Sequence, residues 1–147
     1  MATYKGSKGV RDWVESEAKR NMNLIAISSI DKLERQLKTS SKNGGFTQAD
    51  TGNMIRSIRK SVTSMPQVDT EEKEYTDVQF FLSPDKLGGH VYIGVQAVYG
   101  PRMNYGFTGE DSLGRNYNYT GSFFVEKAGA MWDKFKAESA KEIGSAK

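Results

Sequence analysis

The segment from residue 8 to residue 38 restricts the fold more than any other part of the chain, because its pattern predicts one long helix. It contains no proline, and apolar residues recur three or four positions apart, as one helical face requires. These residues are Val14, Ala18, Met22, Ile25, Leu33 and Leu37. Pairs such as Glu15 with Lys19 place an acid four positions before a base, which favours an exposed helical surface.

The apolar stripe of this helix is wider than a single contact surface needs. Five further apolar residues broaden it: Val10, Trp13, Leu24, Ile27 and Ile30. We therefore expect the helix to contact both its own sheet and a neighbouring subunit.

A polar, glycine-containing loop is expected from residue 39 to residue 49, followed by a short helix from residue 50 to residue 61. Asp50 or Thr51 can cap this helix, because a side-chain oxygen there accepts hydrogen bonds from the first free N–H groups. The apolar residues that would hold the helix against a core are Met54, Ile55 and Ile58.

From residue 62 to residue 98 the apolar period changes to two, which predicts the strands of an antiparallel sheet. Residues 77–82 and 91–98 alternate most clearly. A proline and two glycines between them supply a turn, so the two segments predict a hairpin. Residues 62–68 form a weaker strand, which Pro66 assigns to a sheet edge because proline has no N–H for the ladder.

Residues 99–121 show no sustained period and are rich in glycine, asparagine and tyrosine, so we predict a long loop. Loops longer than about 12 to 15 residues are usually functional or mobile. Ser122 can cap a last helix, from residue 122 to residue 140. The inner face of that helix would carry Phe124, Ala128, Met131, Trp132 and Phe135.

The order of these segments predicts an α+β fold. In it, an antiparallel sheet of about three or four strands packs against a long N-terminal helix and a C-terminal helix. The chain has 147 residues. A domain of this length buries roughly 70% of its unfolded surface, so we expect one core and a single domain over residues 1–147.

The residue composition excludes several kinds of chemistry. The absence of cysteine and the presence of one histidine exclude disulfides, thiolate nucleophiles and zinc sites built on sulfur or on several histidines. His90 has no partner in a recognisable motif, so we do not expect it to act as a general base. Asp50-Thr51-Gly52 matches the triplet of aspartic proteases but does not end an apolar strand, so helix capping is the favoured interpretation. We expect no catalytic residue, metal or cofactor, and a hydrolase is the third-ranked interpretation.

Charge and hydropathy limit the partners. Lysine and arginine number 21 against 18 acidic residues, a net charge of +3. The two signs are interspersed, unlike the concentrated charge of dedicated nucleic-acid binders. No run reaches the roughly 18 to 20 apolar residues that cross a bilayer, and residues 1–6 lack the apolar core of a signal peptide. We therefore expect a protein that is made and used in a cytoplasm and does not contact a membrane.

Aromatic and arginine residues gather in the loop predicted for residues 99–121. They are Tyr99, Arg102, Tyr105, Phe107, Arg115, Tyr117 and Tyr119. Such side chains can stack on the bases of single-stranded nucleic acid, and the same residue types are enriched at contacts between proteins. Protein contact is the favoured interpretation, because the preceding strand offers no second aromatic pair on a sheet face. Binding of single-stranded nucleic acid stays the alternative.

Three segments of the chain carry motifs in a fixed order. Residues 50–58 read Asp-Thr-Gly-Asn-Met-Ile-Arg-Ser-Ile. Residues 95–108 lead from a strand into Tyr-Gly-Phe-Thr, and residues 122–128 read Ser-Phe-Phe-Val-Glu-Lys-Ala. In this order the segments resemble the tail-completion, or head-tail joining (neck), proteins of long-tailed bacteriophages. That family shows an Asp-Thr-Gly-x-hydrophobic-x-x-Ser-Ile signature, a Tyr-Ala-x-x-x-Glu-x-Gly-Thr segment after its last strand, and Pro-Phe-x-x-x-Ala at its C-terminal helix.

The resemblance covers residues 8–140 and implies structural roles for the motif positions. These are Asp50, Thr51, Gly52, Ser57, Ile58, Gly106, Phe123, Phe124 and Ala128. The chain departs from the family where Gly100 replaces alanine, Asn104 replaces glutamate and Ser122 replaces proline. Its loop from residue 109 to residue 121 is also longer than is usual in the family.

The resemblance implies a virion protein without catalytic residues that forms a hexameric or dodecameric ring. Such a ring lies between the capsid connector, or adaptor, and the tail. Genomic DNA passes through its lumen without sequence-specific binding. The protein would be assembled in the host cytoplasm. We expect residues 99–121 and one side of the long helix to form the contacts with other subunits or with the connector.

Overall fold

The computed structural model describes residues 7–48, 50–71 and 73–145 and confirms the predicted α+β class. Its longest element is α1 (Ser7–Lys38), a helix of 32 residues. At 1.5 Å per residue this helix extends over roughly 48 Å. The signal-peptide prediction for residues 1–6 and the loop position 49 lie outside the described residues.

Eight further helices and strands and one short 3-10 helix follow α1 among the described residues. In chain order they are η1 (Ser41–Asn43), α2 (Asn53–Arg56), β1 (Ile58–Ser61), β2 (Tyr92–Val95), α3 (Gly100–Tyr105), β3 (Phe107–Glu110), β4 (Asn116–Tyr119), α4 (Phe124–Ala130) and α5 (Trp132–Ser145). The four strands form two antiparallel pairs, β1 with β2 and β3 with β4, rather than one sheet. Ile58 is paired with Val95 in the first sheet, and Phe107 with Tyr119 in the second.

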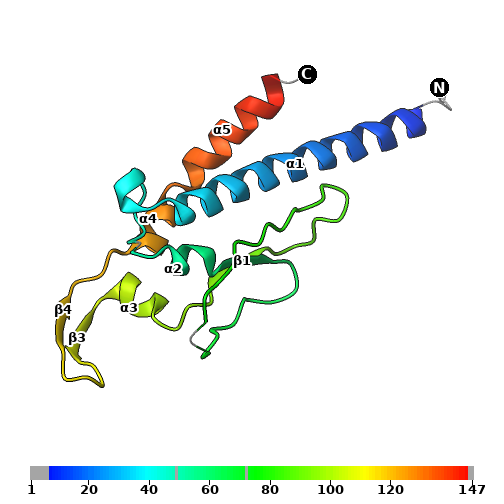
Figure 1. Ribbon diagram of the computed structural model, residues 1–147. Coiled ribbons are helices and arrows are strands. Elements are labelled where there is room, and N and C mark those ends of the chain that lie inside the picture. Colours follow the sequence, from blue (N-terminus) through cyan, green and yellow to red (C-terminus); the bar gives the residue numbers. More distant parts are fainter. Residues whose placement is uncertain (1–6, 49, 72, 146–147) are drawn as a thin grey trace.

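The elements are arranged in layers around the C-terminal half of α1. Helix α5 lies along one side of α1, and α2 with β1 lies on the other side (Figure 1). The β3–β4 hairpin projects at one end of the molecule. The N-terminal half of α1 projects at the other end (Figure 1). The molecule is therefore elongated, with a different element exposed at each end.

The core lies where α1, α2, the β1–β2 sheet and α4 meet. Its buried members are Leu37, Met54, Ile58, Tyr75, Ala97, Phe124 and Ala128. Ile58 and Ala128 are fully buried, and Phe124 is 1% exposed. The spacing of Leu37 and Leu33 in α1 places both against this core, as the helical period predicts.

Lys60 attaches β1 to α1. Its side chain is 5% exposed, and its Nζ lies 2.8 Å from Asp31 Oδ1 and 2.5 Å from Glu34 Oε2. Burial acts to lower the pKa of Lys60, but the hydrogen bonds to Asp31 and Glu34 outweigh it and raise the pKa above its usual value. The lysine therefore stays charged and fixes the sheet beneath the helix.

The predicted hairpin between residues 77–82 and 91–98 is wrong. Only β2 forms a strand there, and it pairs with β1, while residues 77–82 have no regular secondary structure. Just before this segment, a side-chain hydrogen bond is found where strand pairing would give backbone hydrogen bonds. Arg59 Nη2 donates to the Thr76 carbonyl at 2.9 Å, which attaches the start of this segment to β1 through a side chain.

The helix predicted for residues 50–61 and the strand predicted for residues 62–68 are also wrong in extent and position. Helix α2 has four residues, and β1 begins two residues after it. The Ser61 hydroxyl then accepts a hydrogen bond from the Thr63 N–H at 3.2 Å. This local bond turns the backbone out of the strand direction, so the strand ends before residue 62.

The long loop predicted for residues 99–121 contains α3, β3 and β4, and that prediction is therefore wrong. Pro101 stands in the first turn of α3, where a missing N–H has no effect on the helix. The Asp111 carboxylate accepts hydrogen bonds from the N–H groups of Leu113 and Arg115, both at 2.9 Å, and forms the turn between the strands.

The single helix predicted for residues 122–140 is divided into α4 and α5, with the break at Met131. Ser122 does not cap it. The Ser122 hydroxyl donates to the Met103 carbonyl at 3.1 Å, and Phe123 precedes α4 in the left-handed region at φ +50°. A bond to α3 therefore replaces the expected bond to the helix N-terminus.

Candidate functional site

The β3–β4 hairpin and α3 enclose an apolar cavity of about 430 Å³. We call this cavity the aromatic pocket. Its walls are formed by Tyr99, Arg102, Met103, Phe107, Asp111, Tyr117 and Tyr119. A volume of this size lies in the range of roughly 300 to 1,000 Å³ that is usual for ligand-binding clefts. The pocket is therefore large enough to accept a large side chain or a small molecule.

Two glycines position the hairpin beside α3. Gly106 has φ +94°, and a Cβ atom there would lie 2.4 Å from the Tyr119 carbonyl oxygen. Gly121 has φ +85°, and a Cβ atom there would lie 2.5 Å from the Gly106 nitrogen. Only glycine permits this crossing of the two ends of the hairpin. The crossing directs the strands away from the core and opens the pocket between them and α3.

Directly after the crossing, backbone hydrogen bonds attach the chain to α3. The N–H of Ser122 donates to the Met103 carbonyl at 3.1 Å, and the N–H of Phe123 donates to the Asn104 carbonyl at 2.9 Å. Asn104 is 3% exposed, and its side chain donates to Glu126 Oε2 at 2.8 Å. These bonds join α3 to the start of α4, so the floor of the pocket is attached to the core.

Arginine and aromatic rings contact one another inside the pocket. The Arg102 guanidinium carbon lies 4.4 Å from the centroid of the Phe107 ring, within cation–π range. The rings of Phe107 and Tyr117 are tilted, with centroids 6.1 Å apart. Arg102 takes part in none of the ion pairs found among the described residues. Its charge is therefore available to an acidic group of a partner.

Asp111 is the acidic residue of the pocket, and its carboxylate is already engaged. Besides the two turn N–H groups, it accepts bonds from Arg115 Nε at 2.6 Å and from the Tyr117 hydroxyl at 3.2 Å. The backbone bond from Arg115 is the largest cause that lowers the pKa of Asp111 to about 2. Asp111 is ionised at neutral pH, and its role is to hold the turn rather than to transfer protons.

The hydroxyl of Tyr119 stands out because it is buried and lacks a hydrogen-bond partner among the described residues. A tyrosine hydroxyl both donates and accepts, and leaving such a group unsatisfied costs roughly 1 to 3 kcal/mol. Tyr119 lines the pocket, so a bound molecule whose polar atom reached this hydroxyl would remove that cost. Tyr119 is thus a residue of the pocket lining whose hydroxyl lacks a hydrogen-bond partner among the described residues.

Five of the seven residues predicted to form an interface line the aromatic pocket. The other two lie beside it. Tyr105 is 62% exposed, and its ring packs edge to face with Phe123, with centroids 6.3 Å apart. Arg115 pairs with Asp111 at the turn. The sequence reasoning missed Met103 and Asp111. The Asp-x-x-Gly pattern at residues 111–114 is a turn signal that could have identified Asp111.

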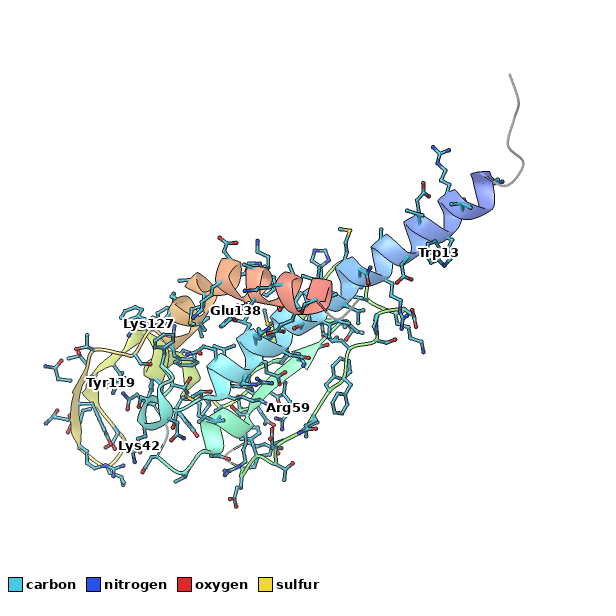
Figure 2. The ribbon with its side chains drawn as sticks, turned by 90° about the horizontal axis from the view of Figure 1, so that it is seen from above. Trp13, Lys42, Arg59, Tyr119, Lys127 and Glu138 are labelled. Atoms are coloured by element: carbon cyan, nitrogen blue, oxygen red, sulfur yellow. The ribbon has the colours of Figure 1, made fainter. Side chains whose placement is uncertain are left out.

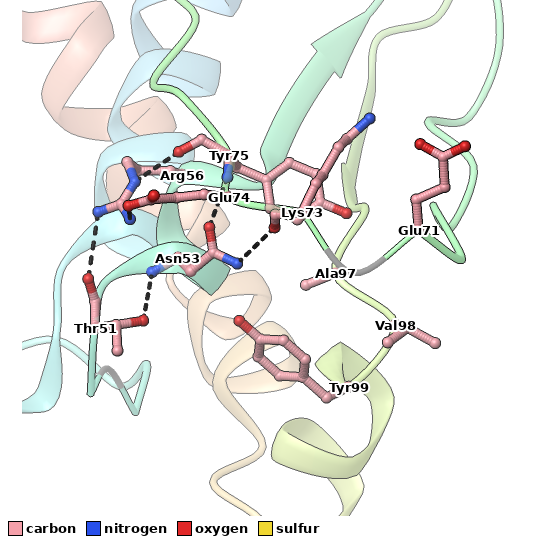
Figure 3. Close-up of a pocket in the computed structure, with 10 residues that line it drawn as sticks. All are labelled: Thr51, Asn53, Arg56, Glu71, Lys73, Glu74, Tyr75, Ala97, Val98 and Tyr99. Atoms are coloured by element: carbon pink, nitrogen blue, oxygen red, sulfur yellow. Dashed lines mark hydrogen bonds and ion pairs between the residues drawn. The ribbon is translucent and has the colours of Figure 1, made fainter.

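Thr51 of the Asp-Thr-Gly motif lines a different cavity, of about 420 Å³ (Figure 3). Asn53 lines it as well. The Asn53 side chain donates to the Lys73 carbonyl at 3.2 Å and accepts from the Tyr75 N–H at 2.6 Å. Arg56 Nε donates to the Tyr75 carbonyl at 2.7 Å. Figure 3 shows these groups pointing at the backbone around Tyr75, so they hold this chain segment in place.

The capping prediction for the motif is wrong for Asp50 and partly right for Thr51. Gly52, at φ +77°, is the residue that precedes α2, and no side chain caps it. The Thr51 hydroxyl accepts a long bond of 3.4 Å from the Asn53 N–H. Asp50 is exposed and lines neither of these two cavities, so nothing in its placement favours the aspartic-protease interpretation.

The other motif positions lie mostly in the interior. Ser57 and Ile58 are fully buried, as is Ala128, and Phe124 is 1% exposed, whereas Phe123 is 41% exposed. The Ser57 hydroxyl donates to the Met54 carbonyl at 2.7 Å and accepts from the Ala97 N–H at 3.2 Å. This serine therefore joins the end of α2 to the chain that follows β2.

His90 is exposed, and its ring stacks on Tyr92 with centroids 6.2 Å apart. Among the described residues, no group of three or more histidine, aspartate or glutamate side chains is arranged to hold a metal ion. Within the same part of the chain, no helix is both long enough and apolar enough to cross a membrane.

Comparison of the chain with protein-family models, with curated proteins and with solved structures finds no significant match.

Proposed function

We propose that the protein is a non-enzymatic structural subunit of a tailed-bacteriophage virion. In this proposal it forms a ring at the head-tail junction that joins the capsid connector to the tail. One observation carries the proposal. Among the described residues, 17 large hydrophobic side chains are exposed, whereas eight hydrophobic side chains are buried. Exposed apolar surface on this scale marks contacts with partners.

Ten of these 17 exposed side chains lie in two sets at the two ends of the molecule, and the other seven lie between residues 62 and 98. One set lies on α3, the hairpin and the start of α4: Tyr99, Tyr105, Leu113, Tyr117, Phe123 and Val125. The second set lies on the projecting half of α1: Val10, Trp13, Val14 and Met22. Figure 2 places Trp13 and Tyr119 at opposite ends of the molecule. Two different exposed apolar surfaces at opposite ends of the molecule favour head-to-tail contacts over a symmetric dimer.

Head-to-tail contacts between identical subunits close into a ring when the rotation per subunit permits it. A ring is the geometry that the head-tail junction requires, because DNA has to pass through its centre. The buried positions of Ser57, Ile58, Phe124 and Ala128 support this assignment further, since these are positions where the sequence resembles the neck family.

Binding of single-stranded nucleic acid through the tyrosines is the alternative. Two observations count against it. Arg115 is paired with Asp111 at 2.6 Å, and the rings of Phe107 and Tyr117 contact each other within the pocket. Stacking on bases needs ring faces that are free, together with cations that follow the phosphates. Affinity for an oligothymidylate that falls steeply with salt and is lost in Tyr117→Ala would favour the alternative.

The proposal is tested by native mass measurement and negative-stain imaging of the purified protein, alone and mixed with the connector of the same virus. We expect ring-shaped particles of six or twelve subunits that bind the connector end-on. A virus lacking this gene should then accumulate filled heads and separate tails. Joined particles from such a virus, or a chain that stays monomeric in the presence of connector, would refute the proposal.

A further inference from the structure

Building on the ring proposed above, we propose that Trp13 of one copy inserts its indole into the aromatic pocket of the next copy. The occupant of the pocket is thus a second copy of this chain. The contact is heterologous, because the helix end of one subunit meets the hairpin end of its neighbour.

Trp13 cannot fill the aromatic pocket of its own chain. Trp13 lies in the projecting half of α1, and Tyr119 of the pocket lies at the far end of the molecule (Figure 2). Trp13 is 65% exposed, and its neighbours Val10 and Val14 are 63% and 50% exposed. Among the described residues, the tip of α1 therefore presents an exposed apolar cluster, which a second molecule can cover.

The chemistry of an indole suits the residues that line the pocket. The indole carries one N–H, which donates and cannot accept. The Tyr119 hydroxyl is buried without a partner among the described residues and can accept such a bond. The rest of the indole is apolar, as are the walls that Met103 and Phe107 contribute. Tryptophan therefore satisfies both parts of the cavity, whereas an aliphatic side chain would satisfy only one.

The charges around the two surfaces are also complementary. Glu17 is four positions after Trp13, so the two residues lie on the same face of α1. Arg102 stands at the pocket and belongs to none of the ion pairs among the described residues. An indole seated in the pocket would bring the Glu17 carboxylate near the pocket, where the Arg102 guanidinium could pair with it. Such a pair at the rim fixes orientation more than it adds affinity.

The area of the contact predicts how assembly depends on concentration. One tryptophan buries about 150 to 250 Å², well below the roughly 800 Å² per partner of a stable interface. A pair of copies held by this contact alone would be weak. Closing a ring gives every copy two contacts, so assembly should be cooperative, with few dimers at intermediate concentrations.

The first test is removal of the anchor. Trp13→Ala should raise the dissociation constant for self-association roughly 30-fold or more, as expected for an interface hot spot. Phe81→Ala is the matched control, because Phe81 is an aromatic residue that is 83% exposed and lies on neither surface. Sedimentation velocity over a concentration series measures both variants. Equal effects of the two substitutions would overturn the proposal.

The second test uses a charge swap between different copies. Arg102→Glu alone sets Glu17 against a glutamate, and Glu17→Arg alone sets Arg102 against an arginine, so each variant should assemble poorly. A one-to-one mixture restores opposite charges at every contact if the two variants alternate around the ring. We expect the mixture to assemble at wild-type concentrations. A mixture that assembles no better than its separate components would overturn the contact.

The two proposals fail in distinguishable ways. If the wild-type chain forms rings and Trp13→Ala forms them equally well, the tryptophan contact is refuted and the ring proposal stands. If the wild-type chain stays monomeric at every concentration, both alone and with connector, the ring proposal fails and the contact fails with it. Loss of connector binding without loss of self-association in Arg102→Glu would assign the pocket to the connector and refute a second copy as its occupant.

Discussion

Gly106→Ala should release the hairpin from the rest of the molecule. The new Cβ atom would lie 2.4 Å from the Tyr119 carbonyl oxygen and 2.8 Å from that of Thr120, and both are backbone atoms that cannot rotate away. Holding alanine at φ +94° and ψ 171°, a region essentially restricted to glycine, costs roughly 1 to 3 kcal/mol by itself. With the clash added, we expect a loss of about 2 kcal/mol or more for the closed hairpin.

That loss corresponds to a rise of about 30-fold in the population of the open hairpin, since 1.4 kcal/mol is a factor of ten. Amide hydrogen exchange of residues 107–119 should accelerate by this factor, while exchange in the α1–α5 region stays unchanged. Self-association should weaken with it, because the pocket loses one wall. Gly129→Ala is the control, since nothing lies within 4 Å of its Cβ position and alanine favours the helix. Unchanged hairpin exchange in Gly106→Ala would refute the reasoning.

Three further predictions concern polar side chains that hold the fold. Lys60→Met should lower the free energy of unfolding by about 1 to 3 kcal/mol, measured by urea denaturation. The pKa of Lys60 is raised in the folded state, so its contribution to the free energy of unfolding is present below about pH 10.5. This contribution is lost as the pH rises through the higher pKa of the folded state. The stabilities of variant and wild type should therefore converge at that pH. Asp111 stabilises the hairpin above its usual pKa of 3.8, and this is lost as the pH falls through about 2, so Asp111→Asn should remove the acid sensitivity of hairpin amide exchange. Asn53→Ala should cost about 1 to 3 kcal/mol in the same denaturation assay, because it leaves the Tyr75 N–H without its acceptor; a loss below about 0.5 kcal/mol would contradict this.

Sequence patterns predicted the elements that are stabilised by periodic burial. The helix expected from residue 8 to residue 38 is confirmed as Ser7–Lys38, because its apolar spacing persists over many turns. The α+β class is confirmed for the same reason: the period changes from that of a helix to that of a strand and back. The predicted aromatic and arginine residues do come together, since five of them line one pocket.

Patterns failed where single side chains decide the path of the backbone. Residues 77–82 alternate like a strand, yet a side-chain bond from Arg59 to the Thr76 carbonyl attaches the start of this segment to β1. Ser61 ends β1 with one hydroxyl, and Asp111 forms a hairpin turn with one carboxylate. Strands of four residues are too short to show a period, so residues 99–121 looked irregular although they form a helix and a hairpin.

In the proposed ring, folding and assembly would depend on different residues, so substitutions that affect one can be told apart from substitutions that affect the other. Lys60 and Asn53 hold the monomer together through bonds to α1 and to the backbone around Tyr75. Substituting them should lower stability by an amount that does not change with protein concentration. Trp13 contributes little to its own subunit because it is 65% exposed, so its loss should leave the monomer intact. If Trp13 forms the proposed contact, the stability that it supplies comes from neighbouring copies and should grow with protein concentration by mass action.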